Sequence, residues 1–199
     1  MRQWGNVMDK KEVIAFFDTL ASSWDDMQVR NEKVIDFILT KGAVTKGADV
    51  LDIACGTGVL FPDYLEREVS SVTGIDISDE MLKVAKDKFP QVRLICDDAE
   101  NYDFKDKYDV IMIYNAFPHF PNPESLLLNL SKALKDGGRL TVAHGISEKE
   151  LAKCHSGSAK NVSLPLPSKE KLAGMMPTSL KVDVMISDDE KYIVSGVKY

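Results

Sequence analysis

Short apolar runs alternate along this chain with stretches in which apolar residues recur at helical spacing. Runs rich in Val, Ile and Leu predict buried strands at about 49–53, 72–76, 92–96, 109–114 and 138–143. Between them, apolar residues three and four positions apart predict helices at about 59–68, 79–88 and 123–135. Regular alternation of strand and helix indicates a parallel sheet with helices on both faces.

The two ends of the chain depart from this alternation. Helical patterns over Val13–Leu20 and Glu32–Leu39 precede the first strand. Towards the other end, apolar runs at 180–186 and 191–197 bracket a Ser-Asp-Asp-Glu turn, which predicts a hairpin. The expected fold is therefore α/β, a doubly wound and mostly parallel sheet that ends in an antiparallel hairpin.

The turn after the first predicted strand points to a ligand. Residues 50–60 read V-L-D-I-A-C-G-T-G-V-L, so an apolar strand enters a turn of small residues before a helix begins. Gly56 and Gly58 leave room for a ligand against the backbone, and the N–H groups of the following helix point towards it. Asp76 ends the second strand, where an acidic residue binds a ribose diol in doubly wound folds. The pattern predicts a nucleoside site.

Two residues help to choose between nucleoside cofactors. A dinucleotide fingerprint needs a third glycine where this chain has Phe61, which argues against a nicotinamide-dependent oxidoreductase. Asp52 would repel a pyrophosphate, but it would attract a ligand that carries an ammonium and a sulfonium. The run D-I-A-C-G-T-G resembles motif I of the class I S-adenosylmethionine (SAM)-dependent methyltransferases, with Ala54 where many members have the first glycine.

This resemblance implies a Rossmann-like seven-stranded sheet and a set of cofactor contacts. The segment Asp98-Ala-Glu resembles the part of the family that binds adenine, with Asp97 as the alternative register. Asn115 follows the fourth predicted strand, which in the family lies beside the transferable methyl group. The implied cofactor-binding residues are Trp24, Asp52, Ala54, Cys55, Gly56, Gly58, Asp76, Ile77, Met81, Asp98, Ala99 and Asn115.

A second resemblance lies ahead of the core. Phe17–Asp25 resembles the F-D-x-x-A-x-x-Y-D segment of ubiquinone- and menaquinone-biosynthesis-type methyltransferases, with Trp24 in place of the tyrosine. In that group the segment forms part of a lid, and an indole face suits a sulfonium cation; the alternative is that Trp24 only anchors the core. We expect one domain over 1–199. Its predicted parts are an N-terminal helical lid (1–44), a SAM-binding core (45–144), a substrate-side cap (145–178) and the C-terminal hairpin (179–199).

Composition narrows the class of substrate. A net charge of −6 disfavours a nucleic-acid substrate, and no apolar run approaches the ~18 residues of a membrane span. The three cysteines form no close pair, which favours the reducing cytoplasm over a disulfide framework. We therefore expect a cytoplasmic SAM-dependent methyltransferase that acts on a small molecule. A protein or RNA methyltransferase and a non-catalytic SAM-binding protein remain as alternatives.

The chain has only three histidines, and all follow predicted strands on the ligand side. His119 follows the fourth strand, His144 ends the fifth, and His155 lies in the polar region after it. His119 is the first candidate for a catalytic base, against a purely structural role. The three rings are expected to share one pocket, either for acid–base chemistry or, with Cys154, around a divalent metal such as zinc. The acid–base version is preferred, because the spacing matches no recognised ligand motif.

Overall fold

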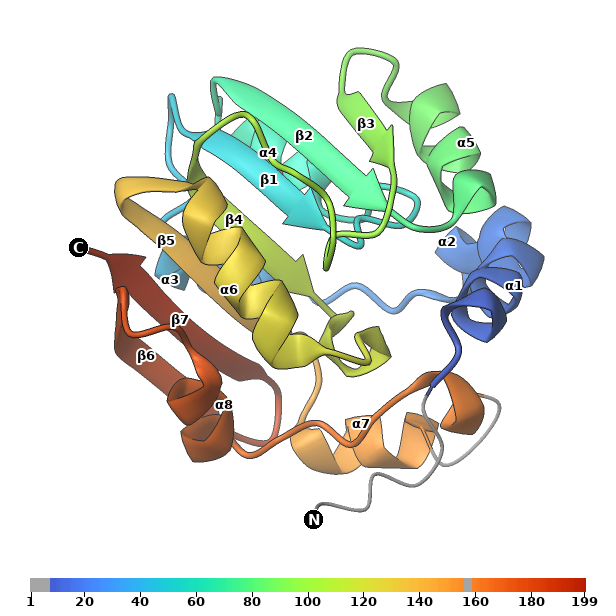
Figure 1. Ribbon diagram of the computed structural model, residues 1–199. Coiled ribbons are helices and arrows are strands. Elements are labelled where there is room, and N and C mark those ends of the chain that lie inside the picture. The colour runs from blue at the N-terminus through green and yellow to red at the C-terminus, as the bar shows by residue number, and fades with distance from the viewer. Residues whose placement is uncertain (1–7, 156–158) are drawn as a thin grey trace.

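A seven-stranded sheet with strand order β3-β2-β1-β4-β5-β7-β6 runs through the protein (Figure 1). The structure is a computed structural model that describes residues 8–155 and 159–199. The first five strands are parallel, whereas β7 runs antiparallel to both β5 and β6. The doubly wound sheet with an antiparallel C-terminal hairpin is thus confirmed. The strands are β1 (Asp49–Ile53), β2 (Ser71–Asp76), β3 (Arg93–Cys96), β4 (Tyr108–Tyr114), β5 (Leu134–His144), β6 (Leu180–Ser187) and β7 (Tyr192–Lys198).

Helices cover both faces of the sheet. On one face, α6 and α8 pack on the strands, and α3, α4 and α5 pack on the other. The α-helices are α1 (Lys10–Leu20), α2 (Trp24–Met27), α3 (Glu32–Lys41), α4 (Phe61–Glu66), α5 (Asp79–Lys88), α6 (Pro123–Ala133), α7 (Glu148–His155) and α8 (Lys169–Met175). Short 3-10 turns lie at η1 (Ala21–Ser23), η2 (Phe117–His119) and η3 (Lys160–Val162).

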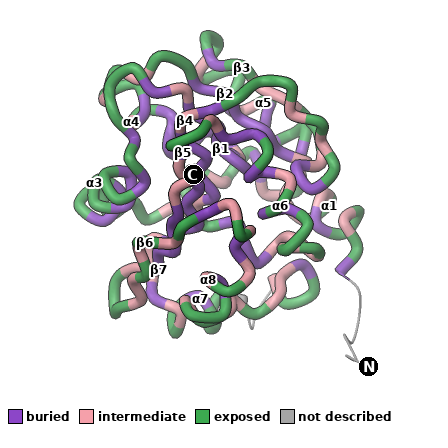
Figure 2. Tube along the Cα trace, turned by 60° about the vertical axis from the view of Figure 1, so that its left-hand side comes forward, coloured by how far each residue is buried: buried purple, intermediate pink, exposed green. Residues whose placement is uncertain are grey.

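The central strands are buried because they meet apolar helices on both sides. Val50 of β1 and Met112 of β4 belong to the core under α3 and α4, whereas Leu51 and Ile111 belong to the core under α6. Alternate residues of a strand point to opposite faces, so a strand covered on both faces must be apolar at nearly every position. Figure 2 shows the buried residues concentrated along these strands.

Two of the predicted part boundaries do not match the packing. Helix α3 buries Ile38 and Leu39 in the sheet core, so it is a core helix and only α1 to α2 lie ahead of the core as a separate segment. Within 145–178, α8 buries Leu172 in the core on the face that α6 also covers. The prediction grouped α3 and α8 by their order along the chain. Their buried apolar residues instead make them part of the helical layers on the two faces of the sheet.

Some predicted features lie outside the part of the chain that the structure describes. These are residues 1–7 of the expected lid and 156–158 of the expected cap; the side chain of His155 is not described either. Among the described helices, none combines the length and apolar character that crossing a bilayer requires.

Candidate active site

A pocket opens where the carboxyl ends of the parallel strands meet. It encloses about 1020 Å³ including its open mouth, and apolar atoms dominate its surface. Ligands of open α/β sheets bind at this edge of the sheet. Every predicted cofactor residue except Gly58 lines it, and so does the predicted base, His119.

The turn after β1 is built from left-handed backbone. Ala54 has φ +52° and Gly56 has φ +54°, conformations that glycine adopts without steric strain. A Cβ atom on Gly56 would meet no atom within 4 Å, so the missing side chain leaves space at the pocket wall. Gly58 does not line the pocket; a Cβ there would lie 2.6 Å from Cδ2 of Phe61. Its glycine is required by helix packing and by a φ of +82°, and its predicted contact with the cofactor stays a prediction.

Asp76 holds two turns together at the end of β2. Its Oδ2 accepts a hydrogen bond from Gly56 N at 2.8 Å, and its Oδ1 accepts one from Ser78 N at 2.9 Å. Burial raises the pKa of Asp76 above its usual value, although these backbone hydrogen bonds oppose the shift. Ser78, not Asp76, caps α5, because its Oγ accepts from Met81 N at 3.1 Å. Asp76 therefore fixes the shape of the pocket floor and still has lone pairs for a ligand hydroxyl.

Asp52 lies beneath the same turn and is only 3% exposed. Burial raises the pKa of Asp52 well above its usual value; the nearby Tyr64 hydroxyl opposes the shift, and the charge of Asp76 adds to it. Burial likewise raises the pKa of the neighbouring Cys55 thiol, with the Asp76 and Asp52 charges adding to it. A buried carboxyl surrounded by these groups is a favourable site for a cationic ligand group, which would stabilise its ionised form.

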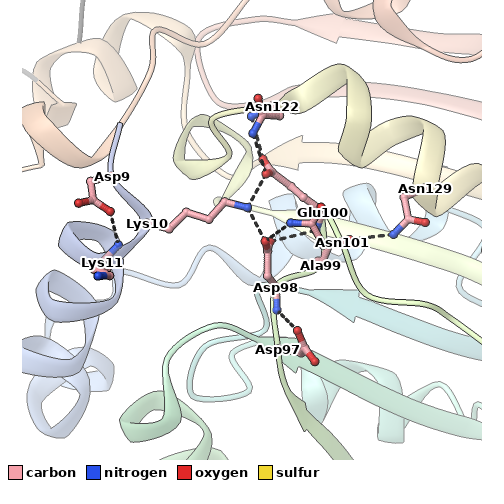
Figure 3. A network of polar contacts seen from close by, with 10 residues as sticks. All are labelled: Asp9, Lys10, Lys11, Asp97, Asp98, Ala99, Glu100, Asn101, Asn122 and Asn129. Atoms are coloured by element: carbon pink, nitrogen blue, oxygen red, sulfur yellow. Dashed lines mark hydrogen bonds and ion pairs between the residues drawn. The ribbon is translucent and has the colours of Figure 1, made fainter. Parts of the chain in front are cut away.

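The loop after β3 carries a polar network that reaches α1 (Figure 3). Lys10 Nζ donates to Asp98 Oδ2 and to Glu100 Oε2, both at 2.5 Å. Burial disfavours the Lys10 ammonium, but the hydrogen bonds with the two carboxylates prevail and raise the pKa of Lys10. Glu100 Oε1 also accepts from Asn122 N at 2.8 Å. Asp97, the alternative in the predicted register, lines the pocket beside Asp98.

Two further contacts attach the N-terminal helices to the strand ends. Ser78 Oγ donates to Asp18 Oδ1 at 2.6 Å, and Thr57 Oγ1 donates to Asp25 Oδ1 at 2.6 Å. Lys88 also pairs with Asp25 at 2.5 Å. Asp18 and Asp25 are the two aspartates of the segment F-D-x-x-A-x-x-W-D. Both therefore anchor the segment to the turns that follow β1 and β2.

Aromatic rings from three segments meet over the pocket. The ring of Phe17 packs edge-to-face against Trp24 at 5.6 Å and against His119 at 5.0 Å between centroids. His119 Nδ1 lies 2.7 Å from the carbonyl oxygen of Val162. A carbonyl only accepts, so Nδ1 carries the proton and, in the neutral ring, Nε2 is the basic nitrogen.

Asn115 and Tyr114 close the pocket at the end of β4. Asn115 has φ +53°, and its Oδ1 accepts from Gly145 N at 2.9 Å. Burial raises the pKa of Tyr114, and a hydrogen bond with Asn115 opposes the shift. Asn115 thus joins the ends of β4 and β5, whereas its predicted contact with the cofactor stays a prediction.

His119 and His144 do not share a pocket, which contradicts this part of the expected meeting of three histidines. His144 is fully buried, packs against Tyr192 at 6.1 Å between ring centroids, and does not line the pocket. The side chain of His155 lies outside the described residues. Within the described ranges, no three His, Cys, Asp or Glu side chains are grouped to hold a metal ion. Of the two histidines whose side chains the structure describes, His119 lines the pocket, whereas His144 pairs in the sheet opposite Tyr192 and is buried.

The prediction missed Lys10 and Tyr114, both of which line the pocket. Lys10, Val13 and Phe17 all line it from α1, at positions three and seven residues apart, which is the spacing of one helix face. That periodicity was available in the sequence. No sequence pattern, however, indicated that a lysine on this face would contact carboxylates about ninety positions away.

Comparison with known proteins agrees with this site. Residues 50–138 match a family described as a methyltransferase domain. The chain is 31% identical over 146 residues to a ubiquinone biosynthesis O-methyltransferase of Escherichia coli O7:K1, covering 67% of this chain and 60% of the relative. The same enzyme of Escherichia fergusonii is 31% identical over 140 residues, covering 64% and 58%. The chain thus spans less than two thirds of the length of these relatives.

Solved structures share the fold. A Haloferax volcanii methyltransferase in complex with the Trm112 activator superposes with TM-score 0.79 at 18% identity, covering 92% of this chain and 97% of that one. The S-adenosylhomocysteine (SAH) complex of DhpI superposes with TM-score 0.75 at 15% identity, covering 98% of each chain.

The strand order, the glycine turn with its two acidic strand ends and the matched domain define a class I methyltransferase, the class whose cofactor is SAM. Residues 50–138 of this chain form a methyltransferase domain of that class. Within it, the chain is similar to the ubiquinone biosynthesis O-methyltransferases.

Proposed function

We propose that this protein transfers the methyl group of SAM to a hydroxyl group of a small molecule. The observation that supports this most directly is the position of His119. It lines the same pocket as Asp52 and Asp76, so a proton acceptor and a nucleoside-binding turn share one cavity. Bound SAM supplies an electrophilic methyl group; the protein has to align the acceptor, keep water out and remove a proton.

The residues present fit SAM in charge and shape. Asp52 is buried, and the groups that shift its pKa include no cation, so an ammonium would complete the site. Asp76 would take the ribose hydroxyls, and the open wall at Gly56 leaves room beside the backbone. Asp98 or Asp97 would take the adenine amino group, with the backbone N–H of Ala99 beside it.

His119 would remove the acceptor proton. Its Nδ1–H is held by Val162, which orients the ring and makes Nε2 the basic nitrogen. Phe17 and Trp24 cover this part of the pocket with apolar surface, which favours exclusion of water and suits a flat, apolar acceptor. An O-methyltransferase activity of the relatives supports a hydroxyl over an amine or a thiol.

A small acceptor is favoured over a macromolecule. The net charge of −6 opposes binding to RNA, and residues of α1 and α2 form part of the pocket wall, which favours an acceptor small enough to enter the pocket. A non-catalytic SAM-binding protein is the remaining alternative, and a cytoplasmic location stays a prediction.

Calorimetric titration with SAH and with NAD tests the cofactor, and methyl transfer from labelled SAM to hydroxylated aromatics, amines, thiols, proteins and RNA tests the acceptor. We expect SAH to bind, NAD to give no signal, and label to pass to a hydroxylated compound. Tight NAD binding without SAH binding would refute the proposal. SAH binding without transfer to any acceptor would favour the non-catalytic alternative.

Replacing His119 by Asn tests the base. Asn retains an N–H donor for the Val162 carbonyl but has no basic nitrogen. We expect turnover to fall by roughly 10²- to 10⁴-fold, the usual contribution of general base catalysis, with unchanged SAH affinity. His144→Asn is a control at a histidine outside the pocket. Unchanged turnover in His119→Asn would remove the catalytic role.

A further inference from the structure

Among the described residues that line the pocket, Lys10 is the only lysine or arginine. It projects from the first turn of α1 into the loop after β3, as Figure 3 shows. Its side chain is 27% exposed, and those of its partners Asp98 and Glu100 are 21% and 2% exposed. The network therefore lies at the boundary between the segment ahead of the core and the loop proposed to hold adenine.

Because Glu100 is buried, separating this ion pair is expected to cost more free energy than separating an exposed pair. Exposed ion pairs stabilise proteins by about 0–1 kcal/mol, as expected for Lys83 with Asp79 and Glu80 on the surface of α5. A buried carboxylate that loses its cation is different, because its charge stays away from water without compensation. Opening α1 away from the core would leave Glu100 in that condition, so the charge of Glu100 favours the closed position of α1.

The network also continues to the acceptor side of the pocket. Glu100 Oε1 accepts from Asn122 N at 2.8 Å, and Oε2 accepts from Asn122 Nδ2 at 3.1 Å. Asn122 precedes α6 and directly follows Phe120 and Pro121, both of which line the pocket beyond His119. One buried carboxylate thus contacts α1 on one side and the segment that carries His119 on the other.

We propose that Lys10 is a positioning residue, which holds α1 closed over the pocket through Asp98 and Glu100 and thereby links cofactor binding to the arrangement of the His119 segment. The binding part of this proposal rests on the proposed function. Lys10 keeps Asp98 directed towards the cofactor side, and Glu100 transmits the position of α1 to Asn122.

The test uses the full chain and five variants: Lys10→Met, Lys10→Arg, Glu100→Gln, the double variant Lys10→Met with Glu100→Gln, and the control Lys11→Met. Lys11 is the exposed neighbour of Lys10 on the same helix and points away from the network in Figure 3. Amide hydrogen exchange of α1 is measured without ligand, and SAH affinity is measured by calorimetry. The exchange experiment does not depend on cofactor binding. It therefore tests whether Lys10 attaches α1 to the core even if SAH fails to bind to the wild type.

We expect α1 to exchange on the order of tenfold faster in Lys10→Met and in Glu100→Gln, with no further increase when the two are combined. Lys10→Arg and Lys11→Met should match the wild type. SAH affinity should fall roughly tenfold in Lys10→Met, as for a lost hydrogen bond between charged groups. If Lys10→Met does not fold, Glu100→Gln, which keeps the shape of the side chain, decides the question.

Wild-type exchange of α1 in both Lys10→Met and Glu100→Gln would overturn the proposal. Tighter SAH binding by Lys10→Met would overturn it as well, because Lys10 would then compete with the nucleobase for Asp98. Failure of the wild type to bind SAH counts against the proposed function and not against the attachment of α1.

Discussion

The two sides of the pocket are held in place by different kinds of contact. On the side of β1 and β2, the turn is fixed by buried strands and by backbone hydrogen bonds to Asp76. On the other side, α1 buries only Val13 and α2 buries no residue, so these helices rely on side-chain contacts with the strand ends. The cofactor side is therefore preformed, whereas the other side is held by a small apolar cluster around Val13 and Val162 and by a few polar contacts.

The largest expected difference between the two sides is in hydrogen exchange. Helices as short as α1 and α2 are unstable alone, so without ligand their amides should exchange on the order of a thousandfold faster than those of β1 and β4. Added SAH should slow α1 and α2 and leave the central strands unchanged. Helix α3 is the matched control, because it is close in length to α1 and also precedes the sheet, but it is buried in the core. Equal protection of α1 and α3 without ligand would contradict the comparison.

Replacing Gly56 by Ala tests the cofactor side directly. Its positive φ makes Ala unfavourable by about 1–2 kcal/mol, and the new methyl group would occupy the open pocket wall. We expect SAH affinity to fall roughly thirtyfold, a loss of about 2 kcal/mol within the usual range for overpacking.

Gly47→Ala is the control for this substitution. Gly47 has φ +81° and equally open surroundings, but it precedes β1 at the opposite edge of the sheet. Both variants should lose similar stability in denaturant unfolding, and only Gly56→Ala should lose SAH affinity. If both bind SAH normally, Gly56 is needed for the turn alone.

A smaller effect is expected from Asp52. Because its pKa is raised in the free protein and an ammonium would lower it, ligand binding should release a proton. SAH affinity should therefore rise with pH from the usual aspartate pKa of about 3.9 up to the raised value, and then level off. Asp52→Asn should bind roughly tenfold more weakly on the high-pH side and lose this component of the pH dependence. Calorimetry at several pH values and in two buffers of different ionisation enthalpy measures both.

The same substitution should change stability in the opposite direction. A carboxyl with a raised pKa in the folded state stabilises the fold at low pH, and this contribution disappears as pH rises through the raised pKa. Above that pH, Asp52→Asn should unfold at a higher temperature than the wild type while binding SAH less well. An unchanged or lower unfolding temperature there would show that Asp52 is already stabilised in the free protein.

The sequence predicted those features of the site that depend on residues close together in the chain. Five strands, the turn after β1 and the acidic end of β2 follow from short patterns in which each residue acts on near neighbours. Ala54 occupies the position of the first glycine of motif I, and its backbone adopts the left-handed conformation that glycine usually has there. At Gly58 the pattern also requires a glycine, but only the packing of Phe61 shows a structural reason for it.

The remaining features depend on contacts between distant positions. Lys10 meets Asp98 and Glu100 from 88 and 90 residues away, and no local pattern marks such a pair. His119 and His144 both lie at predicted strand ends in the sequence. In the structure, His144 packs against Tyr192 of the hairpin, whereas His119 lines the pocket. The role of α3 was misassigned because its place in the chain suggested a lid, whereas its buried Ile38 and Leu39 make it part of the core.

The attachment of α1 and α2 has a consequence for the diversification of such enzymes. The segment from residue 10 to residue 27 meets the strand-end turns through Lys10, Asp18 and Asp25, and their partners lie in loops that follow β1, β2 and β3. A segment from another methyltransferase that kept these three side chains at the same helical spacing could be grafted onto this core. The graft would replace Val13, Phe17 and Trp24, and with them much of the wall that faces the acceptor, while the turn at Gly56 stayed intact. If the proposed function holds, we expect exchange of this one short segment to change the range of acceptors while cofactor binding is retained.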